Sequence, residues 1–327
     1  MDALTDTFGR RHDTLRLSVT DRCNLRCRYC MPEDGVPSRD RQDLLSFEEL
    51  AFVVGVARKM GIDRVRLTGG EPLLRRDLPE FVEMLDRGHA LDDLAMTTNG
   101  LLLARRAEAL AEAGLDRVNV SLDSLDPETY RELTRHGDLE EVARGLEAAH
   151  GAGLTPIKLN VLALKGVNDG EFDQWVEVVR DRNLTVRFME LMPIGEAGRQ
   201  YGPSDFVDLS AVRERLVDRY GMEPAVPSVG NGPARYWCEP GADGKLGFIT
   251  PLSHPYCSNC SRLRMDAMGR LRPCLAYDRG VELGEAARAR DDSAVEAGIR
   301  RALDQKPRGH RWNEGETTEA AMSRVGG

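Results

Sequence analysis

Over roughly the first two thirds of the chain, short runs typical of β-strands alternate with amphipathic segments typical of helices. The strand-like runs comprise residues 14–20, 63–68, 93–98, 116–122, 155–164 and 184–192. The helix-like segments between them lie near residues 47–60, 77–87, 101–113, 138–152 and 171–181. Strands joined through helices run parallel, with right-handed crossovers. The sequence therefore predicts an α/β fold built on a parallel sheet.

Within the strand-like runs, polar and apolar side chains alternate, so that each strand has one face of each kind. Leu15 and Leu17 alternate with Arg16 and Ser18, and residues 116–122 show the same pattern. Strands covered by helices on both faces would read as continuous apolar runs. The pattern therefore favours a partial (βα)6 barrel resembling a TIM barrel, with a polar lumen. An antiparallel sheet with one wet face is the alternative, and the intervening helices argue against it.

The polar faces of these strands carry basic side chains, which the alternation places in the lumen: Arg16, Arg64, Arg66, Lys158 and Arg187. Buried like charges repel each other and lose hydration. Asp123 is the strand-end carboxylate that the sequence places opposite them. A bound anion of several charges, such as a polyphosphate, explains the arrangement, because guanidinium groups pair well with phosphate oxygens. Solvated arginines near the rim are the alternative.

The regular alternation ends after Met192. A helix is expected near residues 210–220, short β-like pieces at 222–229, 233–238 and 245–250, and helices near 281–289 and 293–304. We therefore expect two units. Residues 1–221 form the barrel core, and residues 222–327 form a C-terminal α+β module that closes the open side of the barrel.

The N-terminal residues, the length of the apolar runs and the net charge indicate in which compartment the protein works and what it binds. Residues 1–13 are polar and show no apolar stretch of a secretory signal, and no apolar run approaches the length of a membrane span. We therefore expect a cytoplasmic protein without a membrane partner. The formal net charge of −9 argues against a nucleic-acid partner.

Two groups of three cysteines are the main candidates for chemistry. The first trio is Cys23, Cys27 and Cys30, and the second trio is Cys257, Cys260 and Cys274. In a reducing compartment, clustered thiols are more often metal ligands than disulfides. A structural zinc site needs four ligands, which His12, His89, His254 or Cys238 would have to complete. A [4Fe-4S] cluster held by three cysteines instead leaves one iron open for a small molecule.

Several motifs together resemble a known family. The first trio, with Tyr29 before its last cysteine, and the run TGGEP at residues 68–72 resemble the radical S-adenosylmethionine (SAM) superfamily. The runs MTTNG, VNVSLDSLD, YCSNCSRLR and LRPCL and the terminal GG resemble, within it, the GTP 3′,8-cyclase family of molybdenum cofactor biosynthesis. This likeness extends over nearly the whole chain.

The resemblance implies roles for matching residues. The first trio holds a [4Fe-4S] cluster whose open iron binds SAM, and the second trio holds a second [4Fe-4S] cluster that faces the guanine of GTP. The positions that match SAM contacts are Tyr29, Gly70, Ser121 and Met192. Those that match GTP contacts are Arg16, Arg66, Thr97, Lys158, Arg262, Leu263 and Arg264, with Arg64 and Arg187 in a triphosphate clamp. Gly326 and Gly327 correspond to a flexible tail that enters the site.

The resemblance also implies the reaction. A radical derived from SAM removes the hydrogen at C3′ of the GTP ribose, and C3′ then bonds to C8 of guanine. This lyase-class cyclisation gives (8S)-3′,8-cyclo-7,8-dihydroguanosine 5′-triphosphate. The implied partners are a low-potential electron donor and a downstream cyclic pyranopterin monophosphate synthase. A radical SAM enzyme that modifies peptides and a zinc protein that binds nucleic acid remain as alternatives, and the sequence leaves open a monomer or a homodimer.

Overall fold

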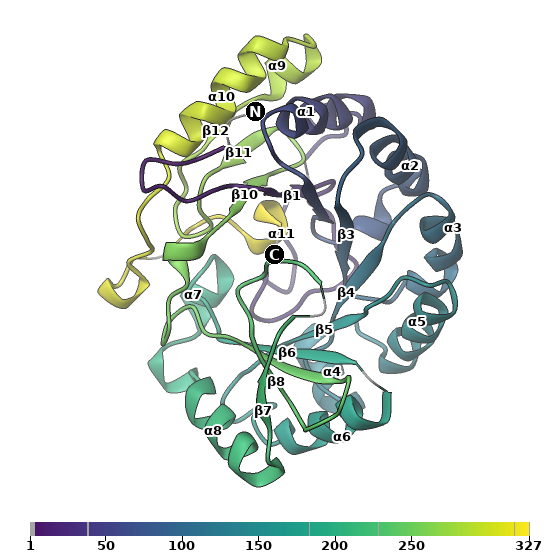
Figure 1. The fold of residues 1–327 in the computed structure, drawn as a ribbon, viewed down its shortest axis with the longest axis vertical. Coiled ribbons are helices and arrows are strands. Elements are labelled where there is room, and N and C mark those ends of the chain that lie inside the picture. The colour runs from purple at the N-terminus through teal and green to yellow at the C-terminus, as the bar shows by residue number, and fades with distance from the viewer. Residues whose placement is uncertain (1–3, 38, 183, 228, 317, 327) are drawn as a thin grey trace.

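The computed structural model describes residues 4–37, 39–182, 184–227, 229–316 and 318–326. Its central feature is a set of parallel strands that curve around a lumen, with helices outside them (Figure 1). These strands are β1 (Thr14–Ser18), β2 (Arg64–Thr68), β3 (Asp93–Thr98), β4 (Arg117–Ser121), β5 (Lys158–Leu162) and β6 (Thr185–Met189). Each pairs in parallel with the next in sequence. The predicted α/β fold with a parallel sheet is confirmed.

Helices connect these strands and form the outer layer (Figure 1). They are α1 (Phe47–Lys59), α2 (Leu78–His89), α3 (Ala107–Glu112), α4 (Pro127–Thr134), α5 (Leu139–Gly151) and α6 (Phe172–Arg182). Helix α1 begins with a capping box, in which Ser46 Oγ accepts from the amide of Glu49 at 3.2 Å and the Glu49 carboxylate accepts from the amide of Ser46 at 2.7 Å. These bonds satisfy amide groups that a helix start leaves without partners.

The apolar faces of the strands pack against the helices. Leu17, Leu67, Val118 and Val120 are fully buried in one continuous core with residues of the helices. Their polar neighbours in sequence therefore face the lumen, because successive side chains of a strand point to opposite faces. The predicted division of each strand into an apolar outer face and a polar inner face is confirmed.

The C-terminal region adds strands to both edges of this core. They are β7 (Glu223–Ala225), β8 (Arg235–Cys238), β9 (Lys245–Ile249), β10 (Arg262–Met265), β11 (Arg270–Arg272) and β12 (Val281–Glu282). Strand β9 pairs in parallel with β6, and β10 pairs in parallel with β1. The resulting 12-stranded sheet runs from β12 to β7, and among the described residues these end strands do not pair, so the barrel is partial as predicted.

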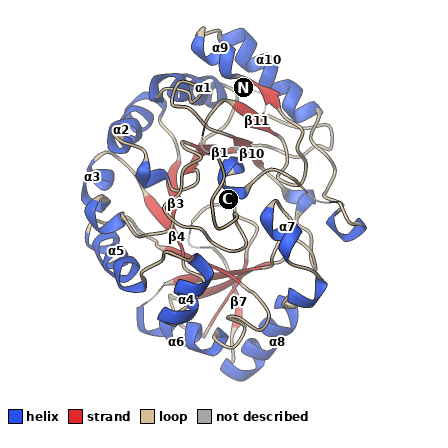
Figure 2. Ribbon diagram, turned by 180° about the vertical axis from the view of Figure 1, so that it is seen from behind, coloured by secondary structure: helices blue, strands red, loops and turns tan. Residues whose placement is uncertain are grey.

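The remaining helices and the C-terminus complete the structure. The helices are α7 (Glu196–Gln200), α8 (Leu209–Tyr220), α9 (Gly284–Arg288), α10 (Asp292–Asp304) and α11 (Met322–Val325). Seen from either side, the C-terminus lies inside the ring of strands and helices (Figures 1 and 2). Among the described residues, no helix combines the length and the apolar character that crossing a membrane requires.

Some element predictions were wrong. Helix α4 was not predicted, because its eight residues follow a strand closely and precede another helix. Strand β10 was not predicted either, since its sequence RLRM is short and half basic. Residues 281–289 do not form one helix: Val281 and Glu282 pair with β11, and α9 follows. The division at residue 221 remains a prediction.

Candidate functional site

The first trio lies in the loop that follows β1. Burial raises the pKa of Cys23 to about 11 and that of Cys30 to about 12, and it raises the pKa of Cys27 well above its usual value. The neighbouring sulfurs add to these shifts in Cys27 and Cys30, so the three thiols lie close to one another. Three half-buried thiols so close together can become thiolates together only if a positively charged centre compensates them.

Close contact between two loops explains the paired glycines of the TGGEP run. The amide of Gly70 donates to the carbonyl oxygen of Thr20 at 2.9 Å, and the amide of Glu71 donates to that of Arg22 at 2.7 Å. A Cβ atom on Gly70 would lie 2.3 Å from the Arg22 carbonyl oxygen. Any side chain at this position would therefore push the TGGEP loop away from the loop that carries the first trio.

Glu71 joins this pair of loops to the end of β3. Its carboxylate accepts hydrogen bonds from Thr98 Oγ1 at 2.7 Å and from the amide of Asn99 at 2.7 Å. Only 1% of its surface is exposed, and burial raises the pKa of Glu71 to about 7. The sequence resemblance drew attention to the glycines but not to this carboxylate, which joins the loop after β2 to the end of β3.

The four residues predicted to contact SAM gather at the C-terminal edge of the sheet. Gly70 follows β2, Ser121 ends β4, and Met192 follows β6. Tyr29 donates a hydrogen bond from its hydroxyl to Asp123, 2.6 Å away, just beyond β4. This is the edge where parallel barrels place their chemistry.

Asp123 does not lie opposite the lumen cations, which corrects the expectation from the sequence. Besides the bond from Tyr29, its carboxylate accepts a hydrogen bond from the amide of Leu162 at 2.8 Å. Burial raises the pKa of Asp123 to about 6. Its partners place it beside the first trio instead.

The predicted basic residues do converge in the lumen. Burial and, to a lesser extent, the charges of neighbouring arginines lower the pKa of Arg66 to about 9 and that of Lys158 to about 7. Burial also lowers the pKa of Arg16 well below its usual value, with further contributions from Arg264 and Arg66. Such mutual lowering means that the cations crowd one another, which is the electrostatic signature of an anion site.

The other residues with a predicted GTP contact differ in how they face this space. Thr97 shares the inner face of β3, and Arg187 Nη2 donates to Asn119 Oδ1 at 3.0 Å. Arg64 forms ion pairs with Asp13 at 2.7 Å and Asp63 at 3.4 Å. The buried side chain of Leu263 packs in the core and faces away from the lumen, so a lumen ligand can reach only its backbone.

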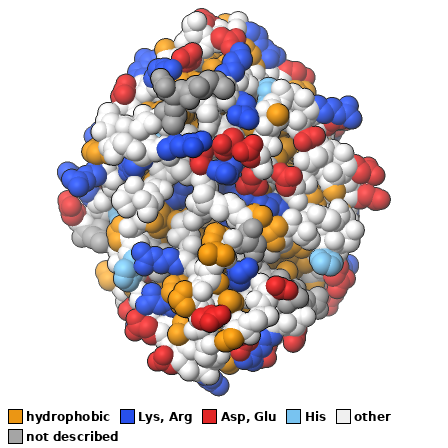
Figure 3. Space-filling view, viewed as in Figure 1, with side chains coloured by type: hydrophobic (Ala, Val, Ile, Leu, Met, Phe, Trp, Pro, Cys, Tyr) orange, Lys and Arg blue, Asp and Glu red, His pale blue; other side chains and the backbone are white. Residues whose placement is uncertain are grey.

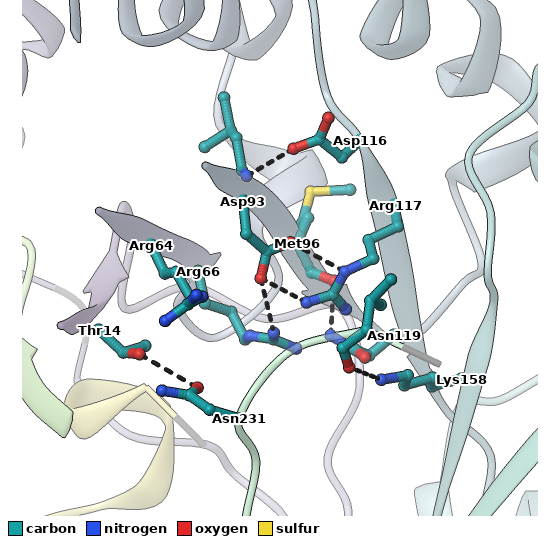
Figure 4. Close-up of polar contacts among 12 residues, drawn as sticks. Thr14, Arg64, Arg66, Asp93, Met96, Asp116, Arg117, Asn119, Lys158 and Asn231 are labelled. Atoms are coloured by element: carbon teal, nitrogen blue, oxygen red, sulfur yellow. Dashed lines mark hydrogen bonds and ion pairs between the residues drawn. The ribbon is translucent and has the colours of Figure 1, made fainter. Parts of the chain in front are cut away.

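An ion pair in the lumen was missed at the sequence level. Arg117 donates to Asp93 from Nε at 2.9 Å and from Nη2 at 2.6 Å (Figure 4). Arg66 lies 4.0 Å from the same carboxylate. The alternation along the strands could have predicted this pair. Arg117 lies two residues before Asn119, and Asp93 lies four residues before Thr97, so each shares the inner face of its strand.

A buried lysine lies beside two cysteines of the second trio, Cys260 and Cys274. Lys306 is 4% exposed and donates hydrogen bonds to the carbonyl oxygens of Arg262 and Pro273. Burial alone would raise the pKa of Cys260, but the charges of Lys306 and Arg262 lower it to about 7. Burial raises the pKa of Cys274, and Lys306 opposes that shift. Lys306 therefore favours the thiolate forms of Cys260 and Cys274.

The residues considered as a fourth zinc ligand make other contacts or lie elsewhere in the fold. His12 binds Asp6 at 3.0 Å, His254 contacts Ser210 at 3.2 Å, and Cys238 lies on β8 near the other end of the sheet order. Within the described ranges, no three His, Cys, Asp or Glu side chains are grouped to hold a single metal ion. A cubane takes each thiolate at a separate iron, so its ligands are spread more widely.

The two trios lie beyond opposite ends of neighbouring strands in the sheet. Strands β1 and β10 are parallel, with Arg16 opposite Arg264. The first trio follows the C-terminal end of β1, whereas Cys260 precedes the N-terminal end of β10. Antiparallel β11 returns the chain to that N-terminal end before Cys274. The cationic lumen therefore separates the two trios.

Comparisons with known proteins identify the family of the chain. Residues 17–179 match the Radical SAM superfamily, and residues 184–312 match Molybdenum Cofactor Synthesis C. The chain is 41% identical over 326 residues to the GTP 3′,8-cyclase of Alkaliphilus oremlandii, covering 99% of this chain and 100% of that protein. It is 43% identical over 328 residues to the GTP 3′,8-cyclase of Moorella thermoacetica, with the same coverage. The chain belongs to the GTP 3′,8-cyclase family.

A solved structure supports the fold of this GTP 3′,8-cyclase family member. Streptococcus suis SuiB bound to S-adenosylmethionine has a TM-score of 0.62 and 15% sequence identity, covering 96% of this chain and 77% of that one. At this identity the likeness extends to the fold alone. The radical SAM superfamily implies a [4Fe-4S] cluster and SAM, and the three neighbouring thiols of the first trio fit such a cluster.

The C-terminal tail of this GTP 3′,8-cyclase family member enters the lumen. Arg264 Nη1 donates to the carbonyl oxygens of Val325 at 3.4 Å and of Gly326. A Cβ atom on Gly326 would lie 2.6 Å from Thr68 Cγ2, at the end of β2. Gly327 lies outside the described residues, and the role of the tail remains a prediction.

Proposed function

We propose that this chain converts GTP to (8S)-3′,8-cyclo-7,8-dihydroguanosine 5′-triphosphate, the first step of molybdenum cofactor biosynthesis. One observation carries the proposal: a lumen rich in arginine separates two cysteine trios. A nucleoside triphosphate is long enough and charged enough to need both a cationic wall and a distant anchor for its base. Full-length identity to GTP 3′,8-cyclases supports the same assignment.

We assign a [4Fe-4S] cluster to each trio. Cys23, Cys27 and Cys30 would hold the first cluster, with SAM near Tyr29, Gly70, Ser121 and Met192. The second would be held by Cys257, Cys260 and Cys274, and Lys306 favours the thiolate forms of the last two. When bound, the first cluster and SAM supply a low-potential electron and a group that removes hydrogen from the substrate.

The residues of the chain would position GTP between these two centres. Arg16, Arg66 and Lys158 would bind the triphosphate from the sheet, with Arg262, Arg264, Arg64 and Arg187 around it. Thr97 and the backbone of Leu263 would contact the rest of the nucleotide. Holding both ends of the substrate fixes its ribose, and the walls of the lumen exclude water from the reacting atoms.

The proposed chemistry indicates the compartment and the partners of the protein. We place the protein in the cytoplasm, where cysteine ligands stay reduced. A low-potential electron donor and a cyclic pyranopterin monophosphate synthase that consumes the product would be its partners. On the face shown in Figure 3, side chains of Lys and Arg intermix with those of Asp and Glu. This face therefore lacks the single-sign charged patch that is typical of nucleic-acid binding.

Metal content and substrate response together test this proposal. After anaerobic reconstitution, the chain should carry about eight irons, against about two zincs for a zinc protein. GTP should stimulate the formation of 5′-deoxyadenosine from SAM, and a peptide library should not. Stimulation by peptides and not by GTP would assign the chain to the peptide-modifying alternative.

A further inference from the structure

We propose that Arg117 is a further phosphate-binding residue of the lumen and that Asp93 is the counter-ion that holds it and competes with the bound phosphates. This inference rests on the proposed function, since it concerns the same nucleotide site. Neither residue belongs to a motif that the sequence analysis singled out. Both lie at the first positions of their strands, β4 and β3, on the inner face.

The geometry of Arg117 leaves one nitrogen available. Its side chain is 3% exposed, and its Nε and Nη2 atoms both donate to the Asp93 carboxylate. The third nitrogen, Nη1, is buried and has no hydrogen-bond partner among the residues that the structure describes. A buried, charged donor without a partner is costly, and native structures rarely leave one unless a ligand or ion satisfies it. The two bonds to Asp93 fix the plane of the guanidinium and therefore the direction of Nη1.

The surroundings of Arg117 are those of the predicted triphosphate site. Burial lowers the pKa values of Arg66, Lys158 and Arg187, and the nearby charge of Arg117 lowers each further. These three cations lie on β2, β5 and β6, so Arg117 lies among lumen cations from three strands. Asp93 also lies 4.0 Å from Arg66 Nη2 (Figure 4).

The two members of the pair should therefore affect anion binding in opposite directions. Arg117 adds a donor and a positive charge, so its loss weakens binding. Asp93 adds a negative charge next to two cations, so its neutralisation strengthens binding. A pair that served the fold alone would behave otherwise. The loss of either partner would leave a buried charge unpaired and reduce stability. Both variants would then change anion affinity in the same direction or leave it unchanged.

The experiment measures how the reconstituted protein binds GTP, guanosine and inorganic tripolyphosphate, by anaerobic calorimetry. Arg117→Gln should weaken the binding of GTP and of tripolyphosphate by about tenfold or more, and guanosine binding should change little. Asp93→Asn should tighten tripolyphosphate binding several-fold. Arg117→Lys keeps the positive charge but replaces the planar fork of the guanidinium by a single ammonium nitrogen. Its affinities should fall between those of wild type and Arg117→Gln, which covers the case in which Arg117→Gln does not fold.

A matched control lies on the surface. Arg180 pairs with Glu239 through the same two nitrogens, each at 2.6 Å, on the exposed side of α6. Arg180→Gln should leave all three affinities unchanged. Equal weakening of guanosine and GTP by Arg117→Gln, or weakening of tripolyphosphate by both lumen variants, would overturn the inference. If the wild-type protein binds neither GTP nor tripolyphosphate, the proposed function fails as well; unaltered binding by Arg117→Gln overturns the inference alone.

Discussion

Arg10 donates a hydrogen bond from Nη1 to the carbonyl oxygen of Cys257 at 2.8 Å, and so joins the N-terminal segment to the second trio. The same guanidinium donates to the carbonyl oxygens of Arg308 at 3.0 Å and Pro307 at 2.7 Å. Asp6, whose side chain is fully buried, holds Arg10 Nε at 2.6 Å. Three segments that are far apart in the sequence are therefore fixed around the second trio by one side chain.

Replacing Arg10 should release the second cluster before the first. Arg10→Met removes all three carbonyl contacts and leaves Asp6 with less compensation, which should cost about 3 kcal/mol of stability. We expect the iron content after anaerobic reconstitution to fall from about eight toward about four per chain, while SAM cleavage persists. Arg11→Met is the control, because the Arg11 side chain is 64% exposed. Full iron loading of Arg10→Met would contradict this role.

Gly70 should tolerate no side chain. In Gly70→Ala, the new methyl group would meet the Arg22 carbonyl oxygen, so the loop that carries the first trio has to move. We expect SAM binding, measured by equilibrium dialysis, to weaken by at least tenfold, an effect of about 1.4 kcal/mol. Gly170→Ala is the matched control, since a Cβ atom there meets nothing within 4 Å. Equal SAM affinities of the two variants would refute this explanation.

Lys158 should make GTP binding depend on pH. Burial, Arg187 and Arg117 lower the pKa of Lys158 to about 7, so much of this lysine is neutral above pH 7 in the nucleotide-free protein. A bound triphosphate favours the charged form and raises that pKa again. GTP affinity should therefore fall as the pH rises above about 7, and binding at about pH 8 should take up close to one proton.

Calorimetry in buffers of different ionisation enthalpy measures this proton uptake. Lys158→Arg supplies the control, because an arginine stays charged across this range. The variant should lack the extra uptake and should show a flatter pH dependence. The same uptake in both proteins would mean that another group titrates.

The C-terminal tail should act on the nucleotide rather than on SAM. Deleting Gly326 and Gly327 removes the carbonyl group of Gly326 that Arg264 binds inside the lumen. We expect GTP cyclisation to fall by at least tenfold, about 1.4 kcal/mol in the barrier, while reductive cleavage of SAM continues. Unchanged cyclisation would rule the tail out.

Much of the site was predictable because strand parity and motif spacing are local properties. The alternation of Leu15 and Leu17 with Arg16 and Ser18 predicted which face turns inward, and the structure confirms it. Parity applied to the first residue of each strand would also have found Asp93 and Arg117. Those positions lie at strand boundaries, where sequence patterns are least certain.

Sequence patterns did not predict the contacts between residues far apart in the chain. Nothing near Arg10 indicates that it binds Cys257, because the contact spans 247 positions. The pairing of β10 with β1 likewise depends on how the C-terminal region folds back. That pairing places the second trio at the far end of the lumen, so the central feature of the site came from tertiary structure.

The most direct test of the proposed reaction follows the hydrogen atom at C3′ of the GTP ribose. The reconstituted protein would be incubated anaerobically with SAM, dithionite and GTP that carries deuterium at C3′, and the 5′-deoxyadenosine formed would be analysed by mass spectrometry. We predict that this product gains the deuterium and that a cyclised isomer of GTP forms alongside it. Unlabelled 5′-deoxyadenosine, or GTP recovered intact, would contradict the central claim.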